Sequence, residues 1–457
     1  MKSDGALAHA LRGDALLRRV VANGAWLIGA SGVGAGLGAV QSVIVARALG
    51  VQGFGTVGLI VAFVNVVGRL TSSRMHEFVI QYVSQYEAGE QSNRAAAIKF
   101  AVVVEVAAAL CAYALLWLTA PLGARWFVRE PDTVFLIRLY GLSVLAGLVS
   151  ETSQGVLQLY GRYRGYSLAS AVGAALSLGG VVAAVVLERG IAGVLIALLV
   201  GAFATGVMLG AAALVEVRRR LGVNWWAARL DHLTSRWRAV LAFVSSTNVS
   251  ATLSMIAKDG DVLWLGLFRG PAEAGLFRLA FSLCALAVLP IGSLVQSIYP
   301  ELARQAARKQ WAEFGQLLRR GTGVAAMYIV PVFAGVGLLS VPLIEVLVGR
   351  QFVPAAPALI ILLVGTGASN LFFWARPALL ALHRPDYQMR VAFALVAIKL
   401  IGVVVLVPIT GYLGSATLAA AIYLPGAALC VWKVREIVRR EQHVDAPMPH
   451  LSASRPR

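Results

Sequence analysis

The sequence predicts an all-helical protein that crosses a membrane many times. Of its 457 residues, 59 % are hydrophobic and only 14 % are charged, whereas an ordinary soluble domain has about 45–50 % apolar and about 25 % charged residues. Apolar runs recur that reach the roughly 20 residues a helix needs to cross a bilayer. The formal net charge is +18, so the few charged positions are mostly cationic. These observations exclude a water-soluble enzyme.

About twelve membrane-spanning helices follow from the apolar runs that lie between charged or turn-rich breaks. Short connections join them, and no hydrophilic stretch is long enough to fold as a separate soluble domain. The predicted spans are 22–46, 54–74, 98–120, 134–158, 167–187, 192–215, 239–264, 274–299, 322–346, 356–382, 388–408 and 413–434.

Lys and Arg residues are distributed unevenly between the two sides of the predicted membrane. If the N-terminus is cytoplasmic, most of the 40 basic residues fall in inner segments. The few assigned to outer segments or helix ends include Arg129, Arg278 and Arg350. Because positively charged loops stay in the cytoplasm, both termini are expected there.

Comparison of the sequence with itself predicts a duplicated unit of six helices. One constant offset relates Gly190 to Gly411 and also relates four further pairs of Pro, Gly, Arg and Tyr residues, and Leu49-Gly50 resembles Leu265-Gly266. Since the repeat spans an even number of helices, both halves enter the membrane in the same orientation. The substrate path is expected in a V-shaped central cavity between the two parallel-repeat bundles.

The predicted organisation has five parts. An amphipathic N-terminal segment lies on the cytoplasmic leaflet, a cytoplasmic linker rich in Arg and Trp joins the two six-helix bundles, and a short cytoplasmic tail ends the chain. The dispersed basic residues favour anionic membrane lipids as partners, and no nucleic acid is expected. In order, the parts are 1–19, 20–215, 216–238, 239–437 and 438–457.

Neither a cofactor nor a metal ion is expected. The three cysteines lie far apart within predicted spans, and most of the six histidines lie in cytoplasmic segments or tails, so no disulfide framework or metal site is indicated. The glycine run at 32–38 follows no strand, and we interpret it as a helix-packing surface rather than a phosphate-binding loop.

A distinctive motif lies at the start of the second half. Residues 260–304 contain Asp261, Leu265-Gly266, Gly270-Pro271, Glu273 and Gly275-Leu276-Phe277, followed by Tyr299-Pro300-Glu301-Leu302, and related stretches lie at 46–70 and 79–90. This pattern resembles that of the lipopolysaccharide and exopolysaccharide (O-antigen type) flippases, which belong to the multidrug, oligosaccharidyl-lipid and polysaccharide exporter superfamily. The resemblance covers residues 18–437.

The resemblance implies a transporter rather than an enzyme. Its substrate would be an undecaprenyl-diphosphate-linked oligosaccharide, moved across the bacterial cytoplasmic (inner) membrane by alternating access for cell-surface polysaccharide assembly. The sugar and the diphosphate would pass through a hydrated cationic cavity while the lipid tail stays in the bilayer. A polysaccharide polymerase is a candidate partner.

Ionisable residues inside the predicted spans are the candidate site residues, because charges within a bilayer usually face a cavity or a partner. Lys399 is the most deeply placed cation and the first candidate for a phosphate contact. Arg376 is a second cation with no charged neighbour within one turn of sequence.

A polar cluster marks the inner end of the second predicted span. Arg69, Ser73, His76 and Glu77 fall on one helical face, with Arg74 beside them. Arginine forks match the oxygens of a diphosphate. We therefore assign Arg69, Arg74, His76 and Glu77 to the substrate cavity.

Acidic residues within the spans have two interpretations. Lys258 and Asp261, with Asp259 between them, either neutralise each other or form a charge switch between transport states. Glu105 and Glu151 are counter-ions to intramembrane cations or, alternatively, proton carriers in coupling.

Two alternative functions fit a membrane protein of this kind. A cation-coupled multidrug exporter of the same superfamily would need an acidic cavity, whereas the intramembrane charges here lean positive. A membrane polysaccharide polymerase or ligase would need a long extracytoplasmic loop with catalytic His or Arg, and the predicted outer loops are short and hold no His.

Overall fold

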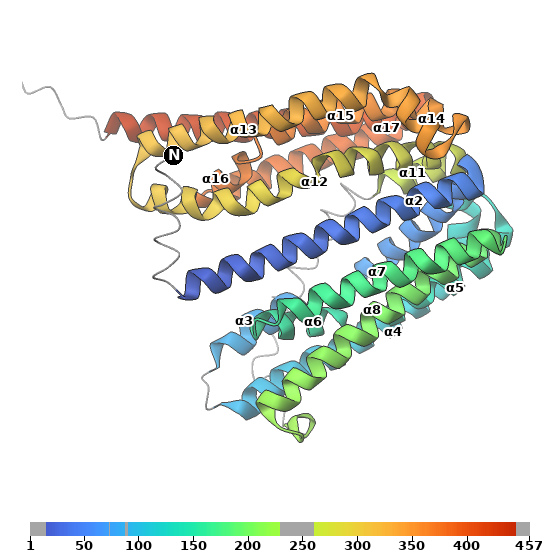
Figure 1. The fold of residues 1–457 in the computed structure, drawn as a ribbon, viewed down its shortest axis with the longest axis horizontal. Helices are drawn as coiled ribbons and strands as arrows, with labels where there is room; N and C mark the ends of the chain where they lie inside the picture. The colour runs from blue at the N-terminus through green and yellow to red at the C-terminus, as the bar shows by residue number, and fades with distance from the viewer. Residues whose placement is uncertain (1–14, 73, 87–89, 229–259, 445–457) are drawn as a thin grey trace, which may run out of the picture. The chain divides into compact units, whose positions relative to one another are not determined.

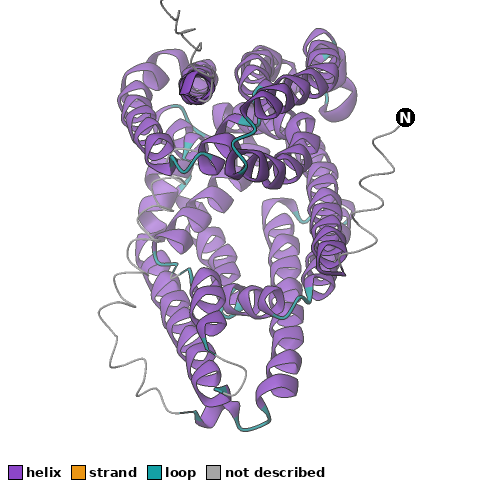
Figure 2. Ribbon diagram, turned by 90° about the vertical axis from the view of Figure 1, so that its left-hand side faces the viewer, coloured by secondary structure: helices purple, strands orange, loops and turns teal. Residues whose placement is uncertain are grey.

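The computed structural model describes residues 15–72, 74–86, 90–228 and 260–444. Figure 2 shows helices and loops, and no strand, over this part of the chain. In a bilayer, long apolar segments satisfy their backbone hydrogen bonds within a helix because no water is present to do so. The predicted all-helical fold class is confirmed.

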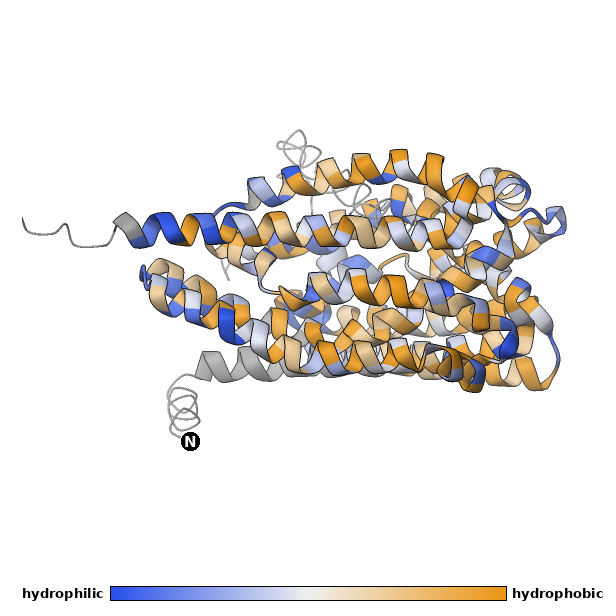
Figure 3. Ribbon diagram, turned by 90° about the horizontal axis from the view of Figure 1, so that it is seen from above, coloured by the Kyte–Doolittle hydropathy of each residue, from blue (hydrophilic) through white to orange (hydrophobic). Residues whose placement is uncertain are grey.

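Nine helical segments of the described chain are long and apolar enough to cross a membrane. Two of them, Gly34–Gln85 and Asp386–Gln442, each overlap two predicted spans, and the other seven overlap one each, so eleven of the twelve predicted spans have a counterpart. The predicted span 239–264 lies mostly outside the described residues. In Figure 3 hydrophobic residues line the lengths of the helices and hydrophilic residues gather near their ends.

The chain divides into two compact units. Unit 1 holds the residues up to Ser282 together with Ile344–Ala355 and Leu406–Ser415, and unit 2 holds Leu283–Leu343, Ala356–Val405 and the residues from Ala416. The predicted linker beyond residue 228, the segment before Ala15 and the tail beyond residue 444 lie outside the described part. The five-part organisation therefore stays a prediction.

Unit 1 is built mainly from long helices packed through small residues. Helices α7 and α8 run side by side (Figure 1) because Gly173 and Gly201 face each other: a Cβ atom at Gly173 would lie 2.9 Å from the carbonyl oxygen of Gly201. The elements are α2 (Ala15–Leu70), α3 (Met75–Gln85), α4 (Gln91–Leu122), the π-helical η1 (Gly123–Val128), the 3-10 helix η2 (Pro131–Thr133), α5 (Val134–Ala146), α6 (Ser150–Leu159), α7 (Tyr163–Val186), α8 (Gly190–Leu221), η3 (Trp225–Ala227), α11 (Asp261–Phe268) and the start of α12 (Pro271–Ala307).

Unit 2 contains the remainder of α12 and the later helices except η4, which belongs to unit 1, and α14 and α17 contribute to both units. Within it α13 packs on α15, where Gly367 leaves room for the ring of Phe333, 2.7 Å from a Cβ at that glycine. The elements from α13 onward are α13 (Trp311–Leu338), α14 (Ser340–Val348), the 3-10 helix η4 (Arg350–Ala355), α15 (Ala356–Leu371), α16 (Ala375–Ala381) and α17 (Pro385–Val444).

The backbone carries the internal repeat. Positive φ angles occur at four pairs of positions that share nearly the same sequence offset, namely Gly50 and Gly270, Arg129 and Gly349, Gly161 and His383, and Gly190 and Gly411. Such angles favour glycine and mark chain turns. Gly50 thus corresponds to Gly270, and not to Gly266 as the sequence match had indicated. Gly266 instead allows close packing, because a Cβ atom at this position would lie 2.6 Å from the carbonyl oxygen of Phe127.

The glycine run at 32–38 does not form a packing surface among the described residues. Nothing lies within 4 Å of a Cβ built at Gly32, Gly34, Gly36 or Gly38. The interpretation of this run as a helix-packing surface is therefore wrong for the described part of the chain. Close approach occurs instead at glycines further along, above all at Gly55 on α2.

Candidate functional site

Helices α2 and α12 cross at a pair of glycines in unit 1. A Cβ atom on Gly275 would lie 2.5 Å from the carbonyl oxygen of Val51, and one on Gly55 would collide with the carbonyl oxygen of Pro271. Small residues let two helix backbones approach this closely. Gly55 and Gly275 are related by the offset that separates Gly50 from Gly270, so equivalent positions of the repeat meet here.

A pocket of about 270 Å³ opens beside this crossing. Its walls come from the second part of α2, the first turn of α11 and the start of α12. The lining residues are Gly58, Val61, Ala62, Asn65, Val66, Arg69, Asp261, Val262, Phe277, Arg278, Phe281 and Ser282. All of them belong to unit 1.

Arg278 is the pocket residue that the sequence analysis missed, having placed it among the outer helix ends. Its guanidinium lies over Gly58, where a Cβ would come within 2.6 Å of Nη1, and 5.0 Å from the ring centre of Phe54. The same Nη1 is buried and has no hydrogen-bond partner among the described residues. A buried donor without a partner is costly, so the guanidinium of Arg278, which lines the pocket, favours an acceptor there. Its place inside the predicted span 274–299, about one turn from the start, is the signal that could have found it.

Two predicted site residues line the same pocket. Arg69 lies in the last turn of α2 and is exposed, whereas Asp261 begins α11 and is only 4 % exposed. Lys258 and Asp259, predicted to act with Asp261, lie outside the described residues. The structure therefore brings together Arg69, Asp261 and Arg278.

The other residues of the polar cluster lie on a different helix. Helix α2 ends at Leu70, and Arg74 adopts a left-handed conformation just before α3 begins at Met75. The expectation that Arg69 shares one helical face with His76 and Glu77 is therefore wrong. Arg74 instead forms an ion pair of 3.3 Å with Glu77.

His76 connects α3 to α6. Its Nε2 lies 2.9 Å from Oε1 of Gln158, and Gly155 on α6 packs against the carbonyl oxygen of His76. The side chain of His76 is thus held by a neighbouring helix of unit 1. Its assignment to the substrate cavity remains a prediction.

Glu105 and Glu151 meet at an interruption of the fourth predicted span. Helix α5 ends at Ala146 and α6 begins at Ser150. The carboxylate of Glu105, on α4, accepts hydrogen bonds from the backbone N–H groups of Glu151 and Thr152. Glu105 is 6 % exposed. These contacts make it a helix-capping carboxylate, a role that the sequence analysis did not consider.

Lys399 and Arg376 lie in unit 2. Lys399 is buried within α17 at 5 % exposure. Arg376 lies in the first turn of α16, and with the Gln388 amide turned so that its oxygen faces the guanidinium, Nη2 and Nε donate to it at 2.8 and 2.9 Å. Their roles in substrate binding stay predictions.

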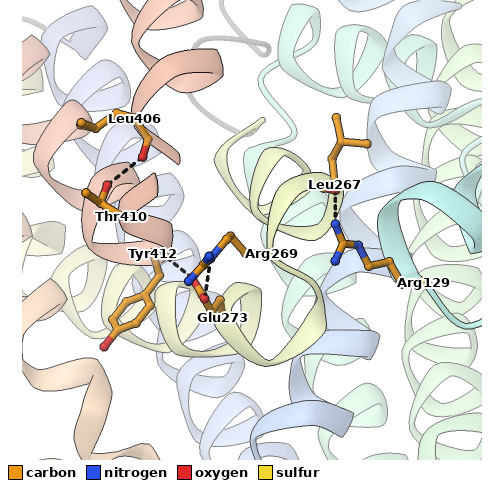
Figure 4. Close-up of polar contacts among 7 residues, drawn as sticks. All are labelled: Arg129, Leu267, Arg269, Glu273, Leu406, Thr410 and Tyr412. Atoms are coloured by element: carbon orange, nitrogen blue, oxygen red, sulfur yellow. Dashed lines mark hydrogen bonds and ion pairs between the residues drawn. The ribbon is translucent and has the colours of Figure 1, made fainter. Parts of the chain in front are cut away.

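The motif at the start of the second half holds one end of unit 1 together (Figure 4). Arg269 Nε lies 2.8 Å from Glu273 Oε1, and Glu273 Oε2 accepts the backbone N–H of Tyr412 at 2.9 Å. Arg129 Nη2 donates to the carbonyl oxygen of Leu267 at 2.7 Å. The motif residues thus frame the pocket: Glu273 and Gly275 fix α12, and Asp261 and Phe277 line the cavity.

No group of three or more His, Cys, Asp or Glu residues suited to a metal ion occurs in the described ranges. Cys111, Cys284 and Cys430 are free thiols. The charged groups that line the pocket are two guanidinium groups and one carboxylate, a balance that suits an anion.

The sequence is similar to that of proteins of polysaccharide and glycan biosynthesis. A family model described as polysaccharide biosynthesis protein matches residues 20–305. The inner membrane protein YghQ of Escherichia coli is 26 % identical over 352 residues, which are 75 % of this chain and 96 % of that protein. The probable low-salt glycan biosynthesis flippase Agl15 of Haloferax volcanii is 22 % identical over 160 residues, 35 % of this chain and 34 % of that protein.

Solved structures share the fold. The lipid II flippase MurJ in an inward closed conformation superimposes with a TM-score of 0.72 at 13 % identity, covering 91 % of this chain and 89 % of that one. An inward-facing multidrug resistance MATE family transporter of the MOP superfamily gives 0.70 at 14 % identity, covering 90 % and 96 %. At these identities the likeness establishes the fold and leaves the substrate open.

Proposed function

The chain belongs to the polysaccharide biosynthesis protein family, and we propose that it is a flippase for a lipid-linked oligosaccharide of the undecaprenyl-diphosphate type. It has the fold of MOP superfamily transporters and crosses the membrane many times. In this proposal it lies in the bacterial inner membrane, with both termini in the cytoplasm, and moves its substrate by alternating access for cell-surface polysaccharide assembly.

The observation that carries the proposal is the guanidinium of Arg278. Its Nη1 is buried in the wall of an intramembrane pocket without a hydrogen-bond partner among the described residues. A diphosphate supplies acceptor oxygens that match such a donor, and charge-assisted hydrogen bonds of this kind are roughly twice as strong as neutral ones. Arg69 on the facing helix provides a second guanidinium at the same pocket.

The charge of the pocket favours an anionic substrate over a cationic drug. Two arginines and Asp261 line it, so the net formal charge of the lining is positive. A cation-coupled multidrug exporter, which shares the fold, would need the opposite balance. The names of Agl15 and MurJ, a glycan biosynthesis flippase and a lipid II flippase, support the same choice.

Anionic lipids fit the end of α8 in this proposal. Arg218 and Arg219 are exposed in the last turn of α8, followed by Trp226, which is 47 % exposed and over which Lys99 lies at 5.7 Å. Arginine and tryptophan together are typical of the headgroup region. Association with a polysaccharide polymerase remains a prediction.

The test is complementation of a strain from which the gene has been deleted. We expect the deletion to accumulate a lipid-linked glycan on the inner leaflet and to lose the surface polysaccharide. Arg278→Ala should fail to restore export, and Arg278→Lys should restore it only in part because an ammonium lacks the planar fork. Arg189→Ala, on an exposed residue outside the pocket, is the matched control and should restore export fully.

Two outcomes would overturn the proposal. Normal surface polysaccharide in the Arg278→Ala strain, with the protein present in the membrane at control levels, would remove the pocket from the substrate path. Sensitivity to cationic drugs without any accumulated glycan in the deletion strain would support the exporter instead.

A further inference from the structure

The fourth predicted span is interrupted inside the membrane at residues 147–149. Hydrogen bonds of turns replace the helical ladder there, from Gly147 N to Val144 O at 3.2 Å and from Ser150 N to Gly147 O at 3.0 Å. A helix that starts inside a bilayer presents N–H groups without intrahelical partners. The beginning of α6 therefore needs acceptors from elsewhere.

Glu105 supplies those acceptors with both oxygens of its carboxylate. Oε1 accepts the N–H of Glu151 at 2.7 Å, and Oε2 accepts the N–H of Thr152 at 2.9 Å. The donors are backbone groups of the helix start, whose partial positive charge stabilises a carboxylate. A buried acid is thus held by groups that cannot themselves ionise.

Thr152 contributes a second, independent observation. Its side chain is buried at 2 % exposure, and the hydrogen-bonding group beside Oγ1 is the carboxylate of Glu105. A hydroxyl can both donate and accept a hydrogen bond. Thr152 can therefore donate to the ionised carboxylate and accept from the protonated one, so it fits both protonation states of Glu105.

We propose that Glu105, with Thr152, forms an intramembrane proton-binding site at the interruption between α5 and α6. When the proton is absent, the carboxylate accepts both N–H groups of α6. When a proton binds to one carboxyl oxygen, the new O–H donates to Thr152 Oγ1 and the N–H bond at that oxygen weakens. The inference that this proton drives transport rests on the proposed flippase function.

A proton fits this site better than a metal cation. Both carboxylate oxygens already accept N–H donors, and the positive end of the helix dipole repels a cation at this place. Sodium would have to displace these donors, whereas a proton adds to a lone pair and neutralises the buried charge. Burial in the membrane disfavours the ionised form and the N–H bonds favour it, so the two effects oppose each other at Glu105.

The titratable groups around the site are few among the described residues. Glu151 at the start of α6 is the charged neighbour that acts on Glu105. On the packed helices, His76 of α3 is bound to Gln158, Tyr140 lies on α5, and the carboxylate of Glu216 on α8 is bound to two arginines. The titration assigned to Glu105 must therefore be separated from that of Glu151.

Infrared difference spectroscopy of the full chain in lipid nanodiscs tests the site without any substrate. Across neutral pH the wild type should show a carboxylic acid band that appears on acidification. Glu105→Gln should remove the band, and Glu151→Gln, the matched control, should keep it. A band that persists in Glu105→Gln, or that is displaced by sodium at constant pH, would overturn the proposal.

A second variant tests the site even if Glu105→Gln fails to fold. Thr152→Val keeps the carboxylate and both backbone donors and removes only the hydroxyl beside them. The midpoint of the band should then move to higher pH, because the ionised carboxylate loses a charge-assisted hydrogen bond, which is stronger than the neutral one that the protonated form loses. An unchanged midpoint would overturn the role of Thr152.

The two proposals fail separately. Export of polysaccharide with no titrating band would remove the proton site and leave the flippase intact. A titrating band in a chain that exports no glycan would leave the proton site and remove the flippase.

Discussion

One interrupted membrane span in unit 1 and one in unit 2 are supported by different chemistry. In unit 1 the ionisable side chain of Glu105 reaches from α4 to the start of α6. In unit 2 the interruption between α15 and α16 is supported from α13 by a neutral pair, Trp374 Nε1 donating to Thr322 Oγ1 at 2.7 Å. The neutral pair shows that a broken span does not need a charge for support. The carboxylate therefore adds a protonation state to a task that neutral groups can perform.

The largest expected effect comes from removing the carboxylate. Glu105→Ala leaves two buried N–H groups without acceptors, at about 1–3 kcal/mol each, so the free energy of unfolding should fall by about 3 kcal/mol or more. Thr322→Val, the matched change in unit 2, removes one neutral acceptor and should cost about 1 kcal/mol. Thermal and denaturant unfolding in detergent measures both. Equal losses of unfolding free energy in the two variants would show that the carboxylate and the neutral pair support their spans equally.

The next prediction concerns the packing of α8 against the interruption between α5 and α6. Gly206 on α8 faces the carbonyl oxygen of Ala146, the last residue of α5, and a Cβ there would collide with that oxygen. Gly206→Ala should cost about 2 kcal/mol through overpacking. Gly179→Ala on α7, where nothing lies within 4 Å of a Cβ, is the control and should leave stability unchanged or raised. Unfolding by chemical denaturant distinguishes them.

A buried carboxylate that is held by arginines should behave differently from Glu105. Glu216 lies between Arg162 and Arg220, with 3.1 Å to each Nε, and these arginine side chains are half exposed. Glu216→Gln should cost about 1–2 kcal/mol, reduced from a fully buried pair by solvent screening. Raising the salt concentration should shrink that loss and leave the loss in Glu105→Ala unchanged. A salt-dependent loss in Glu105→Ala would contradict support of the carboxylate by uncharged groups.

The smallest expected effect concerns the neutral hydrogen bond between Trp374 and Thr322 in unit 2. Trp374→Phe keeps most of the buried ring and removes the N–H that reaches Thr322, so the loss should be about 1 kcal/mol. Combined with Thr322→Val in a double-mutant cycle, the two changes should be clearly less than additive. Additive losses would show that the two side chains act independently.

The membrane spans were predictable from the sequence because length and hydropathy alone determine them. The end of α2 at Leu70 was not, since neither Gly nor Pro lies between it and α3, and Arg74 carries no signal for its left-handed backbone. Because that signal is missing, the sequence wrongly predicted one helical face for Arg69, His76 and Glu77. Local sequence leaves such helix ends undetermined when tertiary packing decides them.

The candidate site was predictable only in part, and for similar reasons. Arg69 and Asp261 stand out as charges within or next to apolar runs. Arg278 is equally visible, but near a helix end it reads as a residue that reaches the headgroups, and only the crossing of α2 with α12 encloses it. The partners of Glu105 are backbone N–H groups exposed by an interrupted helix, and side-chain sequence does not record such donors.

The repeat offset that relates Gly55 to Gly275 also relates Gly58 to Arg278, and the guanidinium of Arg278 lies over the open position of Gly58. Two identical subunits related by a two-fold axis would have to place the same residue at both positions. Two arginines would repel each other there, and two glycines would leave the pocket without this cation. Joining both copies in one polypeptide frees the two positions to differ, so an asymmetric anion-binding wall is available to a fused duplicate and closed to a symmetric homodimer.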